Sequence, residues 1–221
     1  MILEKAVFAV FDFETTGLYP YTGDRICEVG SVRFGVDSER FESFHSLVDP
    51  GRYISPGAFR INGITGAMVR GKPTIDKVLP EFLKFIKGSV LVAYNAGFDV
   101  GFLETALGDD AGALKDYYII DALRLARRLF PGIGRYGLGS VASSLKIEVG
   151  AEHRALADAI MTYRVFKEEL SALRSRGVKT VEDIDRFCSR ERSNVINTVS
   201  DYKVNMVEDV IRQEKRLTTA V

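Results

Sequence analysis

The sequence predicts an α/β domain built around a mixed central sheet, and three observations support this fold class. Apolar runs bounded by Gly, Asp or Pro predict three strands near the start of the chain, at residues 6–14, 25–35 and 40–50. The short separations between these runs are typical of an antiparallel meander. From residue 71 onward, helical periodicity alternates with short β-branched runs, as expected for a sheet covered by helices.

The individual elements of the second half follow from the same signals. Apolar side chains recur at helical spacing within residues 71–88, and Gly88 supplies a helix stop. Short strands are expected at residues 89–95 and 117–121. Further helices are expected from near Phe98 to residue 108, at 122–130, at 138–147 and within 153–177.

The composition is that of an ordinary globular protein. The chain has 221 residues, 46% of them hydrophobic, and equal numbers of basic and acidic residues, 30 of each. This balance argues against a protein that coats polyanions, although it allows a local basic cleft. The two cysteines, Cys27 and Cys188, lie far apart and predict neither a disulfide framework nor a zinc site. With no signal-peptide or membrane-spanning pattern in the sequence, we expect a cytoplasmic protein without membrane association.

The character of the sequence changes near Gly177. We therefore expect one domain at residues 1–176 and a helical, amphipathic extension at residues 177–221. Thr180 and Asp183 have the spacing of a capping box. Beyond them, apolar residues recur at helical spacing at Val195, Val199, Tyr202, Met206 and Val210. This stripe could bind a polymerase, pair with a second copy of the chain or pack on the domain.

Carboxylates follow predicted strands at several points of the chain. Asp12 and Glu14 share one face of the first strand, where burial and mutual repulsion are costly unless positive charge is near. Asp99 follows another strand, and Asp158 lies in a late helix with His153 five residues before it. If His153 precedes that helix, both side chains can face one crevice at the carboxyl ends of the strands. Each residue alone is also compatible with a solvated cap.

Together these segments resemble a known family. The motifs "DFETTGL", "YNAGFD" and "HRALAD" resemble the three motifs of the DEDD exonuclease superfamily, in its histidine-containing, DnaQ-like branch. That branch is typified by the proofreading epsilon subunit of bacterial DNA polymerase III, and the resemblance covers residues from about 6 to 170. It implies a ribonuclease-H-like fold with a five-stranded mixed sheet. It also implies two divalent cations, Mg²⁺ or Mn²⁺, with His153 as general base and with the metal ligands Asp12, Glu14, Asp99 and Asp158.

The resemblance further implies a 3′→5′ exonuclease that hydrolyses single-stranded or frayed DNA ends, releases nucleoside 5′-monophosphates and proofreads with a polymerase in trans. Thr15 and Leu18 would contact the terminal nucleotide. Many relatives have His at the positions of Asn62 and Tyr94, which could line the substrate groove and affect substrate preference. A basic cluster either guides a phosphate backbone or, as we favour, forms a solvated helix face; it comprises Arg124, Arg127, Arg128, Arg135 and Arg154.

Two other functions stay open at this point. An exoribonuclease that trims RNA ends would need the same site, because the motifs concern the backbone and the terminal sugar more than the bases. A catalytically silent nucleic-acid-binding or scaffold protein is the alternative of another class. The presence of all four acids and the histidine argues against that alternative.

Overall fold

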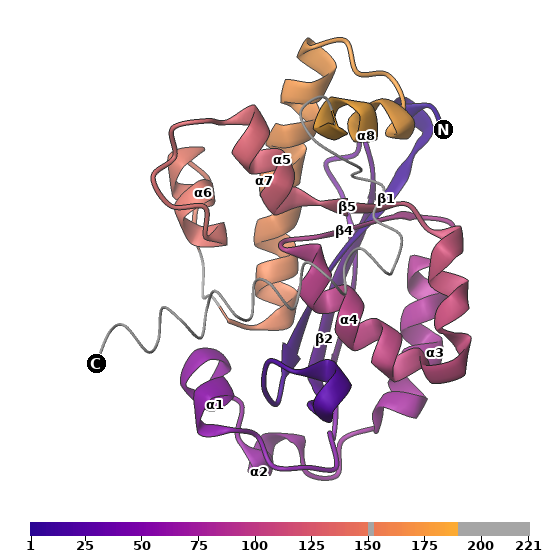
Figure 1. Cartoon of the computed structure of the whole chain (residues 1–221), viewed down its shortest axis with the longest axis vertical. Helices are drawn as coiled ribbons and strands as arrows, with labels where there is room; N and C mark the ends of the chain where they lie inside the picture. Colours follow the sequence, from indigo (N-terminus) through magenta and orange to yellow (C-terminus); the bar gives the residue numbers. More distant parts are fainter. Residues whose placement is uncertain (150–152, 190–221) are drawn as a thin grey trace.

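The computed structural model describes residues 1–149 and 153–189 and contains the expected mixed sheet (Figure 1). The strands are ordered β3-β2-β1-β4-β5. Strands β1, β2 and β3 form the antiparallel meander, whereas β4 and β5 run parallel to β1. Both the α/β class and the five-stranded mixed sheet are thus confirmed. The strands are β1 (Val7–Thr15), β2 (Ile26–Gly35), β3 (Glu42–Leu47), β4 (Val90–Ala93) and β5 (Ile119–Asp121).

Helices cover both faces of this sheet. Figure 1 shows α7 and α5 on one side and α3 and α4 on the other, with α6 beside α7. The helices are α1 (Pro56–Asn62), α2 (Gly66–Val69), α3 (Ile75–Ile86), α4 (Ala96–Leu107), α5 (Ala122–Leu129), α6 (Leu138–Ser144), α7 (Ala155–Ser175) and α8 (Val181–Ser189). Three short 3-10 segments are η1 (Leu3–Lys5), η2 (Pro20–Thr22) and η3 (Gly108–Asp116).

The alternation of side chains along β1 divides the core into two layers. Phe8 packs against Phe166 of α7, with ring centroids 5.1 Å apart. Phe13 points to the other face and packs against Phe82 of α3, with centroids 5.6 Å apart. Since side chains alternate along a strand, Asp12 lies on the α7 face of the sheet, the same face as Phe8. The apolar pattern of β1 therefore determines which helix its carboxylates meet.

Two features of the helices differ from the expectation. Helix α4 begins at Ala96 rather than near Phe98, because Asn95 adopts the left-handed conformation, with φ of 64°, and turns the chain directly from β4 into the helix. Helices α1 and α2 were not predicted. They begin at the capping residues Ser55 and Thr65, whose hydroxyls accept backbone hydrogen bonds, but both are too short to display a periodic apolar stripe.

The predicted capping box at the start of α8 is confirmed. The Asp183 N–H donates to Thr180 Oγ1 at 3.1 Å, and the Thr180 N–H donates to the Asp183 carboxylate at 3.1 Å. Val178, Val181 and Ile184 belong to the same core as Phe8 of β1. The beginning of the expected extension therefore packs into the domain, while the boundary after residue 176 stays a prediction.

Other expectations for the extension concern residues that the structure does not describe. The apolar stripe from Val195 to Val210 and its role in binding a polymerase or a second copy lie outside residues 1–149 and 153–189. Within these described ranges, none of the helices combines the length and the apolar character needed to traverse a bilayer.

Candidate active site and metal centre

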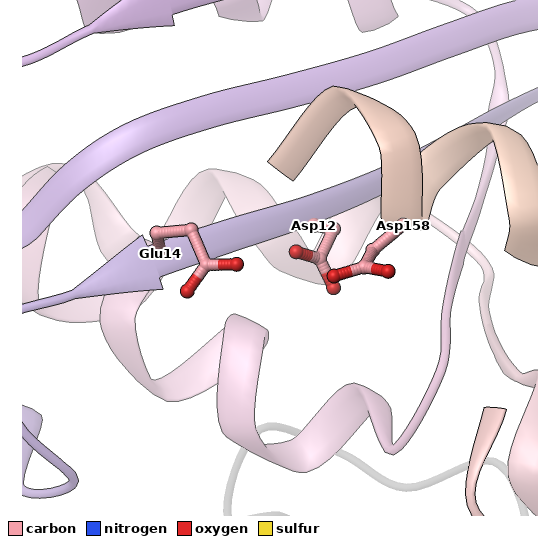
Figure 2. A group of neighbouring side chains, drawn as sticks. All are labelled: Asp12, Glu14 and Asp158. Carbon is pink, nitrogen blue, oxygen red and sulfur yellow. The ribbon is translucent and has the colours of Figure 1, made fainter. Parts of the chain in front are cut away.

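Three carboxylates converge where β1 passes beneath α7. Asp12 and Glu14 come from β1, and Asp158 comes from the first turn of α7 (Figure 2). Each offers one oxygen, and these three oxygens all lie within 4.8 Å of one another. Spacing of this order allows a single cation to contact carboxylates from two elements that are far apart in the sequence.

His153 lies at the edge of the same cluster. Helix α7 begins at Ala155, so His153 lies in the turn before it, with φ of 64°. Its backbone N–H donates to the Asp158 carboxylate at 2.8 Å. His153 is exposed and, together with Asp12 and Asp158, lines a pocket of about 340 Å³. The sequence-based condition for a shared site, that the histidine precede the helix, is thereby met.

Asp99 lies close to these carboxylates but is held differently. It is buried in the first turn of α4, and one of its oxygens accepts the Phe13 N–H at 2.9 Å. Asp99 is absent from the group of three converging oxygens. Its negative charge nevertheless contributes to the raised pKa of Asp12. The structure thus brings three of the four predicted acids together and places the fourth beside them.

The electrostatics of the cluster favour bound positive charge. Burial, followed by repulsion from Asp99 and Glu14, raises the pKa of Asp12 well above its ordinary range. Burial and the negative charge of Asp158 raise the pKa of Glu14 from 4.5 to about 7. Burial also raises the pKa of Asp99, although the hydrogen bond from Phe13 opposes this change. A cation among these oxygens would relieve both repulsion and desolvation, so the donor set fits a hard divalent ion.

The predicted substrate contacts line two pockets beside the carboxylates. Thr15 and Leu18 line a larger and mainly apolar pocket of about 600 Å³, which Glu14 and Asn62 also border. The Thr15 hydroxyl donates to the Gly17 carbonyl at 2.6 Å and so supports the turn that follows β1.

Tyr94 lines the smaller pocket, the one that contains Asp12 and His153. Its hydroxyl donates to the Tyr136 carbonyl at 2.6 Å, and this hydrogen bond also stabilises the loop before α6. A substrate in this pocket would meet the ring of Tyr94 beside the carboxylates.

Three of the five basic residues found in the sequence have structural partners. The Arg124 guanidinium lies 3.9 Å from Asp121, and the Arg128 guanidinium lies over the Phe187 ring of α8, 5.1 Å from its centroid. Arg154 binds the buried carboxylate of Glu28 on β2. The two pockets beside the carboxylates are not lined by Arg124, Arg128 or Arg154.

Sequence reasoning missed two acids near the site, Asp121, which is partly buried, and Glu28. Asp121 caps α5 and accepts hydrogen bonds from the N–H groups of Leu123, Arg124 and Asn95. Glu28 is fully buried on β2; burial alone would raise its pKa, but the bonds from Arg154 and His45 lower it. The sequence does carry one indication that Glu28 is buried, because this acidic residue lies inside the apolar run "ICEVGSV".

Several known proteins have sequences similar to this chain. Residues 9–166 match the RNase_T family model, described as Exonuclease. The DNA polymerase III subunit epsilon of Treponema pallidum is 39% identical over 168 residues, which cover 74% of this chain and 76% of that protein. The PolC-type DNA polymerase III of Clostridium perfringens is 38% identical over 188 residues, 85% of this chain but 13% of that protein. The chain therefore spans only a small part of the PolC-type relatives it matches.

Solved structures give the same result for the fold. Exonuclease X, in complex with 5′ overhanging duplex DNA, superposes with a TM-score of 0.62 at 31% identity and covers 82% of this chain and 99% of its own. A structure of exonuclease I superposes with a TM-score of 0.66 at 21% identity over 78% of this chain and 44% of its own, and supports the fold alone. The five-stranded sheet is thus the ribonuclease-H-like sheet of these enzymes, and the chain belongs to the exonuclease family whose model it matches.

Proposed function

We propose that this protein is a metal-dependent 3′→5′ exonuclease that removes nucleotides from single-stranded or frayed DNA ends as nucleoside 5′-monophosphates. The observation that carries this proposal is the convergence of Asp12, Glu14 and Asp158 beside His153 at an open pocket. The named relatives are DNA polymerase III proteins, and exonuclease X was solved with DNA. They support DNA rather than RNA as the substrate and proofreading, with a polymerase as partner, as the setting.

The four acids would hold two divalent cations, Mg²⁺ or Mn²⁺. The donors are carboxylate oxygens, which these ions prefer over nitrogen or sulfur. Burial, and then repulsion between the acids, raises the pKa of Asp12, Glu14 and Asp99, and a bound cation would offset both effects. When bound, such ions neutralise charge on a phosphodiester and favour ionisation of a water molecule.

The side chains of this chain would divide the remaining work. A ring nitrogen of His153 accepts the proton of the attacking water, a role that imidazole can fill near neutral pH. The Asp158 carboxylate accepts a hydrogen bond from the backbone N–H of His153 and so keeps the base beside the cluster. Thr15 and Leu18 receive the terminal nucleotide in the larger pocket, and the ring of Tyr94 flanks the scissile group from the smaller one.

An end-labelled oligonucleotide assay tests the proposal. A 5′-labelled single strand, in matched DNA and RNA versions, is incubated with Mg²⁺, Mn²⁺ or EDTA. We expect a ladder that shortens by one nucleotide at a time on DNA, requires the metal and is slower on RNA. Asp12→Asn, purified in parallel, should lose this activity, whereas Asp110→Asn, which changes an exposed acid on η3, should retain it.

Each other outcome has a definite meaning. An active Asp12→Asn variant would exclude the proposed metal site. A faster ladder on RNA would replace the proposed substrate with RNA ends. Absence of cleavage of both strands with both metals, by protein that melts cooperatively, would refute the exonuclease activity.

A further inference from the structure

Glu28 is a buried carboxylate whose partners lie at the start of α7. Its side chain accepts from Arg154 Nε at 3.0 and 3.2 Å and from Arg154 Nη2 at 2.6 Å. It also accepts the backbone N–H of Ala155 at 3.1 Å and lies 2.7 Å from Nε2 of His45. Arg154 immediately precedes α7 and Ala155 is its first residue. The strand β2 therefore holds the first turn of this helix through one side chain.

Gly30 is a second contact between β2 and the same turn. In the antiparallel register, Gly30 lies opposite Asp12 and Glu28 lies opposite Glu14, so both face α7. A Cβ atom at Gly30 would lie 2.2 Å from the carbonyl carbon of Ala155 and 2.3 Å from the nitrogen of Leu156. The backbone of α7 thus rests directly on β2, and only glycine leaves room for it.

The turn held in this way carries the functional groups of the proposed site. His153 precedes Arg154 in the chain, and the Asp158 N–H donates to the Arg154 carbonyl at 2.9 Å. The His153 N–H in turn donates to the Asp158 carboxylate at 2.8 Å. A displacement of Arg154 would therefore move both the base and the metal ligand relative to β1.

We propose that Glu28 is a positioning residue, which clamps Arg154 so that Asp158 and His153 stay in register with Asp12 and Glu14. This inference rests on the proposed function for its catalytic consequence, whereas its effect on metal binding can be measured alone. Substitution of a residue that orients metal ligands typically lowers metal affinity or activity by about 10–100-fold.

The test compares Glu28→Gln and Arg154→Lys with Glu42→Gln. Lysine keeps the positive charge but cannot reproduce the forked hydrogen bonds of arginine. Glu42 is a matched control, because it pairs with Arg33 on the neighbouring strands through an exposed contact of 3.5 Å. Mn²⁺ binding is measured by titration calorimetry without nucleic acid, and kcat and KM are measured on a single-stranded oligonucleotide.

We expect Mn²⁺ affinity to fall by about 10-fold or more in both clamp variants and to stay unchanged in Glu42→Gln. In the clamp variants kcat should fall by a similar factor while KM changes little, because Thr15 and Leu18, the proposed contacts of the terminal nucleotide, lie in the other pocket and not on α7. Arg154 is 41% exposed, so Arg154→Lys carries the test if the buried substitution at Glu28 prevents folding.

The outcomes separate the clamp from the proposed function. Folded clamp variants with wild-type Mn²⁺ affinity would overturn the inference, because Glu28 would then serve stability alone. A different result would be weaker Mn²⁺ binding in the clamp variants than in the wild type, with no hydrolysis of DNA or RNA by the wild type or by any variant. In that case the clamp stands and the proposed exonuclease activity fails.

Discussion

Replacing Glu14 by glutamine should stabilise the metal-free protein while weakening its response to divalent cations. In the folded protein the pKa of Glu14 is raised from 4.5 to about 7, first by burial and then by the charge of Asp158. Since one pKa unit corresponds to 1.36 kcal/mol, an ionised Glu14 costs about 3 kcal/mol of folding free energy at pH 8. Glutamine has nearly the same shape and no charge, so it should recover most of this cost.

The pH dependence of this gain has a defined sign. A carboxyl with a raised pKa binds its proton more tightly in the folded state, so the free energy of unfolding increases as the pH falls from 8 toward 4.5. The advantage of Glu14→Gln should therefore shrink from about 3 kcal/mol at pH 8 to about 1 kcal/mol at pH 5.5. For a domain of this size, 3 kcal/mol corresponds to a rise in Tm of roughly 6–12 °C.

Thermal melting in EDTA at the two pH values is the assay, with Glu81→Gln, an exposed residue of α3, as the control. Saturating Mn²⁺ should reverse the order, because the wild-type protein gains stability from a ligand that the variant holds less well. A variant no more stable than the wild type at pH 8, or equally stabilised at both pH values, would show that Glu14 is not ionised in a desolvated site.

Substitutions at three further positions test the local structure around the site and the extension. Thr180→Ala removes the hydroxyl that accepts the Asp183 N–H and should lower the free energy of unfolding by about 1 kcal/mol in urea titrations; an unchanged midpoint would mean that the capping box contributes nothing to stability. Asn95→Gly should be tolerated, whereas Asn95→Ala should cost about 1–2 kcal/mol, because alanine is strained at φ of 64°. Tyr94→Phe removes a hydrogen bond to Tyr136 and should lower the free energy of unfolding by about 1 kcal/mol, while the KM for an oligonucleotide stays unchanged. A large rise in KM would instead show that the hydroxyl binds substrate.

The sequence predicts the sheet well because each strand carries its own signal. Apolar runs end at turn residues, and the alternation within β1 correctly assigns Asp12 to the opposite face from Phe13. The short helices α1 and α2 escape prediction because they lack a complete apolar stripe. The start of α4 depends on the conformation of a single residue, Asn95, which no periodicity reports.

The candidate site is only partly accessible to reasoning from residues. The shared face of Asp12 and Glu14 follows from strand geometry, but the addition of Asp158 and Asp99 depends on the resemblance to the exonuclease motifs. The structure supplies what neither source contains, namely that Asp12, Glu14 and Asp158 converge while Asp99 is bound to the backbone of β1. Local sequence patterns carry no information on such distances, because these distances are set by how α4 and α7 pack on the sheet.

The buried acids of this protein illustrate two solutions to one physical problem. Glu28 and Glu14 lie opposite each other on neighbouring strands, and both would be costly to bury without positive charge. The sequence alone does not tell which of the two carboxylates Arg154 neutralises, because Arg154 lies far from both along the chain, 126 residues from Glu28. The structure assigns the forked hydrogen bonds of Arg154 to Glu28, whose pKa is lowered, and leaves Glu14 with a raised pKa beside Asp158. Within residues 1–149 and 153–189 the arginine thus pairs with Glu28 while Glu14 keeps a raised pKa, and this is a physical reason to expect a metal ion beside Glu14 and an arginine beside Glu28.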